Sequence, residues 1–188
     1  MTTETEWIRL ARQGDQEAFG RLVTVYQTPV YNLTYRMLGN PMEAEDAAQE
    51  AFLRAYTHLR RYNTERSFKT WLLSIASHYC IDRLRRRRIN WMPLEDEIAE
   101  AESLAPNSPN PVAVTIRHEH EREIQQKLEC LVPLDRAAIT LRYWYDYSYE
   151  EIAETLDLTV SAVKSRLHRS RKAMAEMLST DGDYAGRQ

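Results

Sequence analysis

The amino-acid sequence predicts an all-α fold of two small helical domains joined by a flexible linker. Apolar residues recur at helical spacing before residue 90 and again from about residue 112. Between these stretches, residues 93–111 contain four of the seven prolines and five carboxylates without one Lys or Arg, a composition that should not fold alone. We therefore expect domains at residues 1–92 and 117–180, a linker at residues 93–116 and a disordered tail at residues 181–188.

The start of the first domain is predicted to be helical and apolar on one side. The pattern over residues 7–26 indicates a helix that is broken near Gly14, where Asp15 can cap the second part. A further apolar stretch follows Pro29 and stops at Gly39-Asn40-Pro41, which is typical of a helix end and a turn. These residues are expected to form part of the hydrophobic core of the first domain.

The helix predicted over residues 42–59 has an unusual outer face. Alanines at helical spacing form its inward stripe, whereas the apolar Leu53 lies on the opposite side beside Asp46, Gln49 and Glu50. Such a face suits docking of a basic partner, with the charges setting the encounter and the leucine acting as an apolar anchor. An ordinary solvated face is the alternative, and the pattern alone leaves both open.

The next predicted helix ends in a dense cluster of cations. It follows a polar turn at residues 60–67 and finishes with Arg83 and Arg85 to Arg88, five arginines within six residues. This cluster favours salt-sensitive binding of phosphate, and a polar loop beside a basic helix suits a flipped or stacked single-stranded base. A solvated helix end or an anionic-lipid patch is the alternative, and lipid is the weaker one because no amphipathic membrane face accompanies the arginines.

In the second domain, residues 112–144 are expected to form a platform of two helices. Pro133 marks the break between them, and Asp135 is expected to cap the second helix. The aromatic run at residues 143–149 is interpreted as packing rather than as a stacking surface for bases.

Residues 148–172 have the pattern of a helix-turn-helix. Ser148 and Glu151 form a capping box, Asp157 ends the short first helix, and Thr159 can cap the longer second helix. When the second helix is wound at about 100° per residue, its inward side carries four residues, namely Val163, Leu167, Ser170 and Met174. Its opposite face and flanks carry Ser161, Lys164, Ser165, Arg166, His168, Arg169, Arg171 and Lys172.

This second helix is predicted to read DNA. From Thr159 to Lys172 there are five cations and no carboxylate. Arg and Lys bind guanine edges or phosphates, and small hydroxyls let a helix lie close in the major groove. A solvated basic helix at the end of a bundle is the alternative, but the capped first helix and the tight turn favour DNA binding.

Composition and charge exclude several other classes. The net charge of −3 means that nucleic-acid binding depends on local segregation of charge. Cys80 and Cys130 have no CxxC spacing and fit buried thiols in a reducing cytoplasm. His118, His120 and Cys130 lack a fourth ligand at a usable spacing, so we expect neither a metal nor a cofactor. No leader and no membrane-crossing run is seen, so we expect a cytoplasmic protein without membrane insertion.

Three stretches resemble the extracytoplasmic-function (ECF, group 4) sigma factors of bacterial RNA polymerase, and the resemblance covers nearly the whole chain. They are EAEDAAQEAFLRAY (residues 43–56), FKTWLLSIASHYCIDRLRRRR (residues 68–88) and YEEIAETLDLTVSAVKSRLHRSRKAM (residues 149–174). They look like the family's region that docks on the polymerase clamp coiled coil, its promoter-melting and minus-ten region, and its minus-thirty-five-reading helix-turn-helix.

The resemblance implies a function and partners. The chain would bind core RNA polymerase at the clamp and flap, read minus-thirty-five duplex DNA, and melt and capture the minus-ten element as single strand. An anti-sigma factor would hold it inactive until a signal arrives. The linker would thread through polymerase channels, where its acids would mimic nucleic acid.

The resemblance also implies roles for individual residues. Core polymerase would be held by Asp46, Gln49, Glu50 and Leu53. The minus-ten element would be held by Arg61, Tyr62, Asn63, Lys69, Trp71, His78, Arg83, Arg85 and Arg86. In the helix-turn-helix, Arg166 and Arg171 would hold phosphates, while Lys164, Ser165, His168 and Arg169 would face the minus-thirty-five element.

Two other interpretations remain to be separated from this one. A stand-alone helix-turn-helix regulator would bind its duplex without polymerase and would not need the Asp46/Glu50/Leu53 face. A hydrolase or metal enzyme would use the histidines, but no pattern arranges them into a nucleophile-base pair. We also expect that a closed form of the free protein would hide its basic helices against its acidic surfaces.

Overall fold

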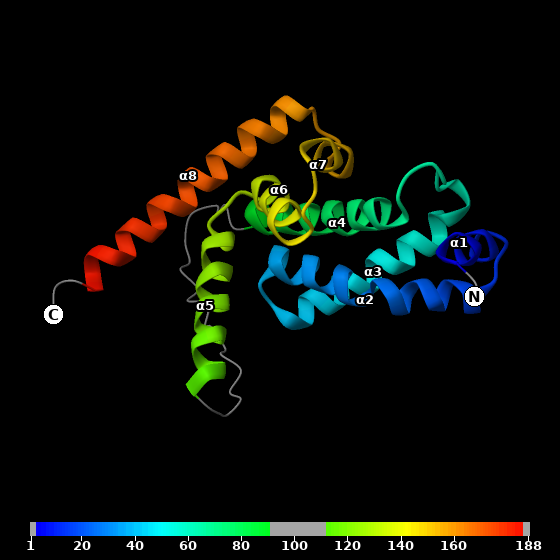
Figure 1. Ribbon diagram of the computed structural model, residues 1–188, viewed down its shortest axis with the longest axis horizontal. Helices are drawn as coiled ribbons and strands as arrows, with labels where there is room; N and C mark the ends of the chain where they lie inside the picture. Colours follow the sequence, from blue (N-terminus) through cyan, green and yellow to red (C-terminus); the bar gives the residue numbers. More distant parts are fainter. Residues whose placement is uncertain (1–2, 91–111, 186–188) are drawn as a thin grey trace.

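The computed structural model describes residues 3–90 and 112–185, and all regular structure within them is helical (Figure 1). The elements are α1 (Glu4–Arg12), α2 (Gln16–Leu38), α3 (Pro41–His58), the 3₁₀ turn η1 (Leu59–Arg61), α4 (Phe68–Asn90), α5 (Val112–Glu129), α6 (Pro133–Trp144), α7 (Tyr149–Leu156) and α8 (Val160–Ala185). The predicted all-α class is confirmed. The proline-rich, acidic residues 93–111 lie outside the described residues. Helix α5 begins within the expected linker, and α8 continues into the expected tail.

Helix α2 is the centre of the first domain and packs against α1, α3 and α4. As the sequence predicts, the chain breaks before it at Gly14, and the Asp15 carboxylate accepts a hydrogen bond from the Ala18 amide at 3.0 Å. Helix α2 then passes through Pro29 without stopping. A single buried stripe continues in phase on both sides of the proline, comprising Leu22, Tyr26, Val30, Leu33 and Met37.

The turn into α3 places two helices close together. Gly39 ends α2 with a left-handed backbone (φ +78°), and Asn40 caps α3 by accepting a hydrogen bond from the Glu43 amide at 3.2 Å. The inward stripe of α3 consists of buried alanines, as predicted, so its backbone can approach α2 closely.

The second domain is α5 to α8, and its helix-turn-helix is confirmed. Ser148 and Glu151 make both bonds of the capping box, at 3.1 and 2.8 Å. The Thr159 hydroxyl accepts from the Ala162 amide at 3.2 Å. The expectation that Asp135 caps α6 is wrong, because Val132 is the N-cap and Asp135 lies buried in the first turn.

The two domains pack together through α6 and α7, which lie against α4, and through α5 and α6, which lie against α2. The buried guanidinium of Arg136 donates to the Met37 carbonyl at 2.5 Å. Near the other end of α6, the Tyr145 hydroxyl donates to the Pro29 carbonyl at 2.5 Å. The second domain is therefore anchored at two points along α2.

The expected hiding of the basic helices is wrong for α8. Figure 1 shows α8, drawn from orange to red, leaving α7 and running outward beyond the other helices. Lys164, Arg169 and Lys172 are exposed on it, and the acidic Asp46 on α3 is also exposed. The closed arrangement therefore leaves both of these surfaces accessible.

The cysteines are only partly as expected. Cys80 is buried, and burial raises the pKa of its thiol to about 12. Cys130 is exposed, so the expectation of two buried thiols is wrong for it. None of the helices in the described part of the chain is long and apolar enough to cross a membrane.

The same substitution is expected to have opposite effects at two glycines. Gly39→Ala should lower the free energy of unfolding by about 1–2 kcal/mol, because an L side chain is strained at its positive φ. Gly20→Ala should raise it by about 1 kcal/mol, since Gly20 lies in the α2 interior with no neighbouring atom within 4 Å of an added Cβ. Urea unfolding of both variants beside wild type measures the two changes in the free energy of unfolding. A Gly39→Ala variant more stable than wild type would contradict the left-handed conformation of Gly39.

Candidate nucleic-acid interface and docking face

The recognition helix α8 divides into an inward and an outward side, as the sequence predicts. Val163, Leu167 and Ser170 are buried, and Met174 is half-buried. The outward residues that are exposed are Ser161, Lys164, Ser165, His168, Arg169, Arg171 and Lys172. Within residues 159–172 no carboxylate interrupts this surface, so α8 presents cations and small hydroxyls to solvent along several turns.

Arg166 differs from the other predicted DNA-binding residues of α8 because it points toward α6. Its side chain is 24% exposed, and its Nη1 donates to Oδ1 of the buried Asp135 at 2.5 Å. Arg169 is 60% exposed, and its Nε lies 3.6 Å from Oδ2 of the same carboxylate. One buried acid therefore contacts two arginines that are three residues apart on α8.

The predicted minus-ten loop is held in shape by an aromatic cluster. Tyr62 is 4% exposed, its ring centroid lies 4.8 Å from that of Trp71 and 5.7 Å from that of Phe68, and its hydroxyl donates to the Arg66 carbonyl. The Asn63 side chain accepts from the Glu65 amide at 3.0 Å, and Asn63 itself is exposed. In this conformation Tyr62 is a core residue, whereas Asn63 and the neighbouring Arg61 remain accessible.

The second domain contacts this loop and the start of α4. The Arg66 guanidinium lies 2.9 Å from the Glu154 carboxylate of α7. The Lys69 ammonium lies 5.6 and 5.9 Å from the ring centroids of Tyr145 and Tyr147, within the range of cation–π attraction. Among the predicted minus-ten residues, Lys69 is thus engaged by the second domain.

The remaining predicted minus-ten residues lie further along α4. Trp71 is half-buried, and His78 is exposed with its Nδ1 at 2.8 Å from the Ser74 carbonyl. Arg83 is half-buried and lies 3.5 Å from the Glu43 carboxylate of α3, which Arg87 also contacts. Arg85 and Arg86 are exposed. The C-terminal part of α4 therefore combines accessible arginines with arginines neutralised by α3.

The predicted docking face on α3 is accessible. Asp46 and Gln49 are exposed, and Leu53 is 60% exposed. Glu50 is half-buried and pairs with Arg54 at 2.7 Å, while the Arg54 guanidinium lies 4.8 Å from the centroid of the Tyr79 ring. The four predicted residues lie on one outer surface of α3.

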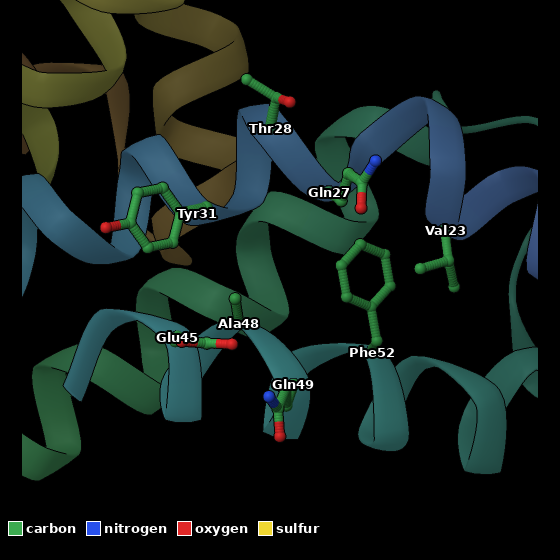
Figure 2. Close-up of a pocket in the computed structure, with 8 residues that line it drawn as sticks. All are labelled: Val23, Gln27, Thr28, Tyr31, Glu45, Ala48, Gln49 and Phe52. Carbon is green, nitrogen blue, oxygen red and sulfur yellow. The ribbon is translucent and has the colours of Figure 1, made fainter. Parts of the chain in front are cut away.

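A hollow of about 550 Å³ lies between α2 and α3 beside this face. Figure 2 shows Phe52 pointing from α3 toward α2 near Gln27 and Val23. Gln49 belongs to both the docking face and the hollow. Sequence reasoning missed the hollow because its lining comes from two helices, and each contributes side chains that look like ordinary surface or core positions. The lining residues are Val23, Gln27, Thr28, Tyr31, Glu45, Ala48, Gln49 and Phe52.

Within the described ranges, no three His, Cys, Asp or Glu side chains gather in a way that would hold a metal ion. His118 and His120 belong to α5, but their side chains lie outside the described part of the structure.

The geometry defines a class of protein: a two-domain helical protein whose helix-turn-helix presents an exposed basic face. Comparison with known families specifies it further. The Sigma-70 region 2 model matches residues 22–89, and the Sigma-70 region 4 model matches residues 121–174. The chain is 40% identical to the ECF RNA polymerase sigma factor SigW of Bacillus subtilis over 179 residues, which cover 91% of this chain and 94% of SigW.

Further relatives agree with this match. The chain is 32% identical to the RNA polymerase sigma-H factor of Pseudomonas aeruginosa, with 93% of each chain covered, and 33% identical to the ECF RNA polymerase sigma-E factor of Escherichia coli K12, with 92% of each covered. The chain therefore belongs to the ECF sigma factors of RNA polymerase, proteins that bind core polymerase and direct it to promoter DNA.

Solved structures share the fold. The structure of CnrH in complex with the cytosolic domain of CnrY matches with a TM-score of 0.69 at 22% identity, covering 95% of this chain and 98% of CnrH. The sigma factor RpoE of Bartonella quintana, solved with the anti-sigma factor NepR, matches with a TM-score of 0.66 at 20% identity, covering 87% of this chain and 98% of RpoE.

Proposed function

We propose that this sigma factor divides its work among three surfaces and has no catalytic site of its own. The α3 face docks on the polymerase clamp coiled coil, the loop before α4 and α4 itself hold the minus-ten element, and α8 reads the minus-thirty-five duplex. It works in the cytoplasm, with the second domain resting on the polymerase flap. The observation that carries this proposal is that Leu53 on α3 and the basic side of α8 are exposed at the same time.

Docking on core polymerase is supported by the chemistry of the α3 face. Leu53 offers an apolar anchor, the exposed Asp46 beside it attracts a basic partner surface, and Glu50 is held in place by its pair with Arg54. The adjoining hollow at Gln49 gives room for a partner side chain between α2 and α3. A partner that covers Leu53 gains binding free energy, because burying this side chain removes apolar surface from water.

Promoter reading by α8 is supported by its exposed face. Lys164, His168 and Arg169 would reach base edges, and Ser161 and Ser165 would let the helix approach the groove. Arg171 and Lys172 would hold phosphates, which fixes the register of the helix on the duplex.

Capture of the minus-ten element requires a change from the conformation described above. Arg66 is paired with Glu154, and Lys69 lies against Tyr145 and Tyr147. A strand entering the loop at Arg66 would meet α7, because Glu154 of α7 pairs with Arg66. The second domain therefore has to leave the first before the minus-ten strand can bind, whereas polymerase docking needs no such opening.

An anti-sigma factor is proposed as the inhibitor. The solved relatives CnrH and RpoE of Bartonella quintana were each captured with a partner, and NepR is described as an anti-sigma factor. An inhibitor that covers the α3 face of this chain would block polymerase docking without any need to reach α8.

The docking proposal predicts the effect of a double substitution. Glu50→Lys with Leu53→Ala should weaken binding to core polymerase by about thirtyfold, since it inverts a charge and removes the apolar anchor, together about 2 kcal/mol. Specific run-off transcription from the DNA just upstream of this protein's own gene should fall accordingly at limiting polymerase. The measurement is a titration of purified core polymerase.

Glu17→Lys is the matched control, because Glu17 pairs with Arg21 four residues later at the same 2.7 Å as the Glu50–Arg54 pair. It should transcribe as wild type does. Equal initiation by wild type and the double variant would refute the docking face. A wild type that binds duplex but never initiates with polymerase would favour a stand-alone regulator.

The required separation of the domains can be tested by cross-linking them. Arg66→Cys and Glu154→Cys in a Cys130→Ser chain place two reactive thiols across the Arg66–Glu154 contact, while Cys80 stays unreactive because it is buried and its pKa is raised. A short bismaleimide should join them. The linked protein should still bind core polymerase but should fail to open the promoter, as measured by permanganate reactivity of unpaired thymines.

The same double-cysteine chain left unlinked is the control for the substitutions themselves. If the linked and unlinked proteins open promoter DNA equally well, the domains do not need to separate.

A further inference from the structure

Asp135 lies where α6 crosses the recognition helix α8. It is 6% exposed, and its two carboxylate oxygens contact two different arginines of α8, Arg166 at 2.5 Å and Arg169 at 3.6 Å. The buried hydroxyl of Ser170 donates to the Arg166 carbonyl at 2.8 Å and lies 3.5 Å from the Asp135 carbonyl.

The two arginines are held differently by this carboxylate. Arg166 is mostly covered and directs its guanidinium inward, so its charge is neutralised inside the domain. Arg169 is mostly exposed, and its Nε lies 3.6 Å from the carboxylate, which is an ion pair beyond hydrogen-bond distance. The attraction of the carboxylate at Nε favours orientations of the Arg169 guanidinium that leave its terminal nitrogens for another acceptor.

Orientation of this kind matters for reading a base pair. A free arginine side chain loses considerable rotamer freedom when it binds, and a side chain that is held beforehand loses less. Bidentate recognition of a guanine edge also needs the fork to be aligned with two acceptors.

We propose that Asp135 is a positioning residue for promoter reading, which holds Arg166 as an internal strut and orients Arg169 toward one base pair of the minus-thirty-five duplex. This rests on the proposed function, in which α8 reads that duplex. It changes the role of Arg166, which the family resemblance assigns to a phosphate. Asp135 itself need not touch DNA, and the specificity of the protein would depend on a residue of α6.

The test uses holoenzyme formed from core polymerase and the full chain, with a library of promoter duplexes randomised over the upstream element. Sequencing the bound fraction gives the preference at each base pair. Arg169→Ala identifies the base pair that Arg169 reads, as the position at which preference is lost. Asp135→Asn should reduce discrimination between base pairs at that position about tenfold and leave discrimination at the other positions unchanged.

A second variant separates positioning from folding. Asp135→Leu with Arg166→Met replaces the buried ion pair by apolar side chains of similar volume, an exchange that often leaves stability unchanged. The positioning role predicts a folded protein that has still lost the preference read by Arg169. If its discrimination equals that of wild type, the acid serves folding alone and the proposal is overturned.

The same double variant tests the role of Arg166. As a strut, Arg166 makes no phosphate contact, so the dependence of log affinity on log salt concentration should match that of wild type. A slope smaller in magnitude by about 1 would show that Arg166 holds a phosphate and would contradict the proposal. A wild-type holoenzyme with no preference at all in the upstream element would overturn the proposed function, and with it this proposal. Wild-type preference that Asp135→Asn leaves intact overturns this proposal alone.

Discussion

The hydrogen bonds of the buried Arg136 guanidinium are the interaction on which the placement of both proposed DNA-reading surfaces depends. The guanidinium donates to the Met37 carbonyl near the end of α2, and to the Glu129 and Leu131 carbonyls at 2.6 and 3.4 Å around the end of α5. Carbonyls at a helix C-terminus lack intrahelical partners and carry the negative end of the helix dipole. Burial lowers the pKa of Arg136, and these three acceptors offset the cost of placing its charge between the domains.

This anchor fixes α6, and α6 carries the helix-turn-helix. Because α6 packs against α2 and α4, helix α7 lies over the start of α4, where Glu154 meets Arg66. The same arrangement turns the basic side of α8 away from the first domain and leaves Leu53 on α3 uncovered. Under the proposed function, a protein built in this way meets polymerase first and frees the loop before α4 afterwards, so the domain interface would order the steps of initiation.

The features that the sequence predicts correctly depend on residues close together in the chain. The capping box of Ser148 and Glu151, the cap at Thr159 and the helix end at Gly39 involve neighbours within one turn, so their patterns are visible before folding. The division of α8 into inward and outward sides follows from helical periodicity. Membership of the ECF sigma factors was predictable because three long motifs carry it.

What could not be predicted depends on contacts between distant helices. Asp is a residue type that often caps a helix, but Asp135 is buried and pairs with Arg166, which lies 31 residues away. Tyr62 has the appearance of a base-stacking residue, yet Phe68 and Trp71 enclose it. No local pattern shows which polar or aromatic residue a second helix will cover.

The measurement that tests the central claim most directly is small-angle X-ray scattering of the free protein, wild type beside Arg136→Met, in low and high salt. A domain interface held by a buried guanidinium and apolar packing predicts one compact wild-type profile at both salt concentrations and a larger radius of gyration for the folded variant. An extended wild type, or a variant as compact as wild type, would contradict the dependence of the domain arrangement on Arg136.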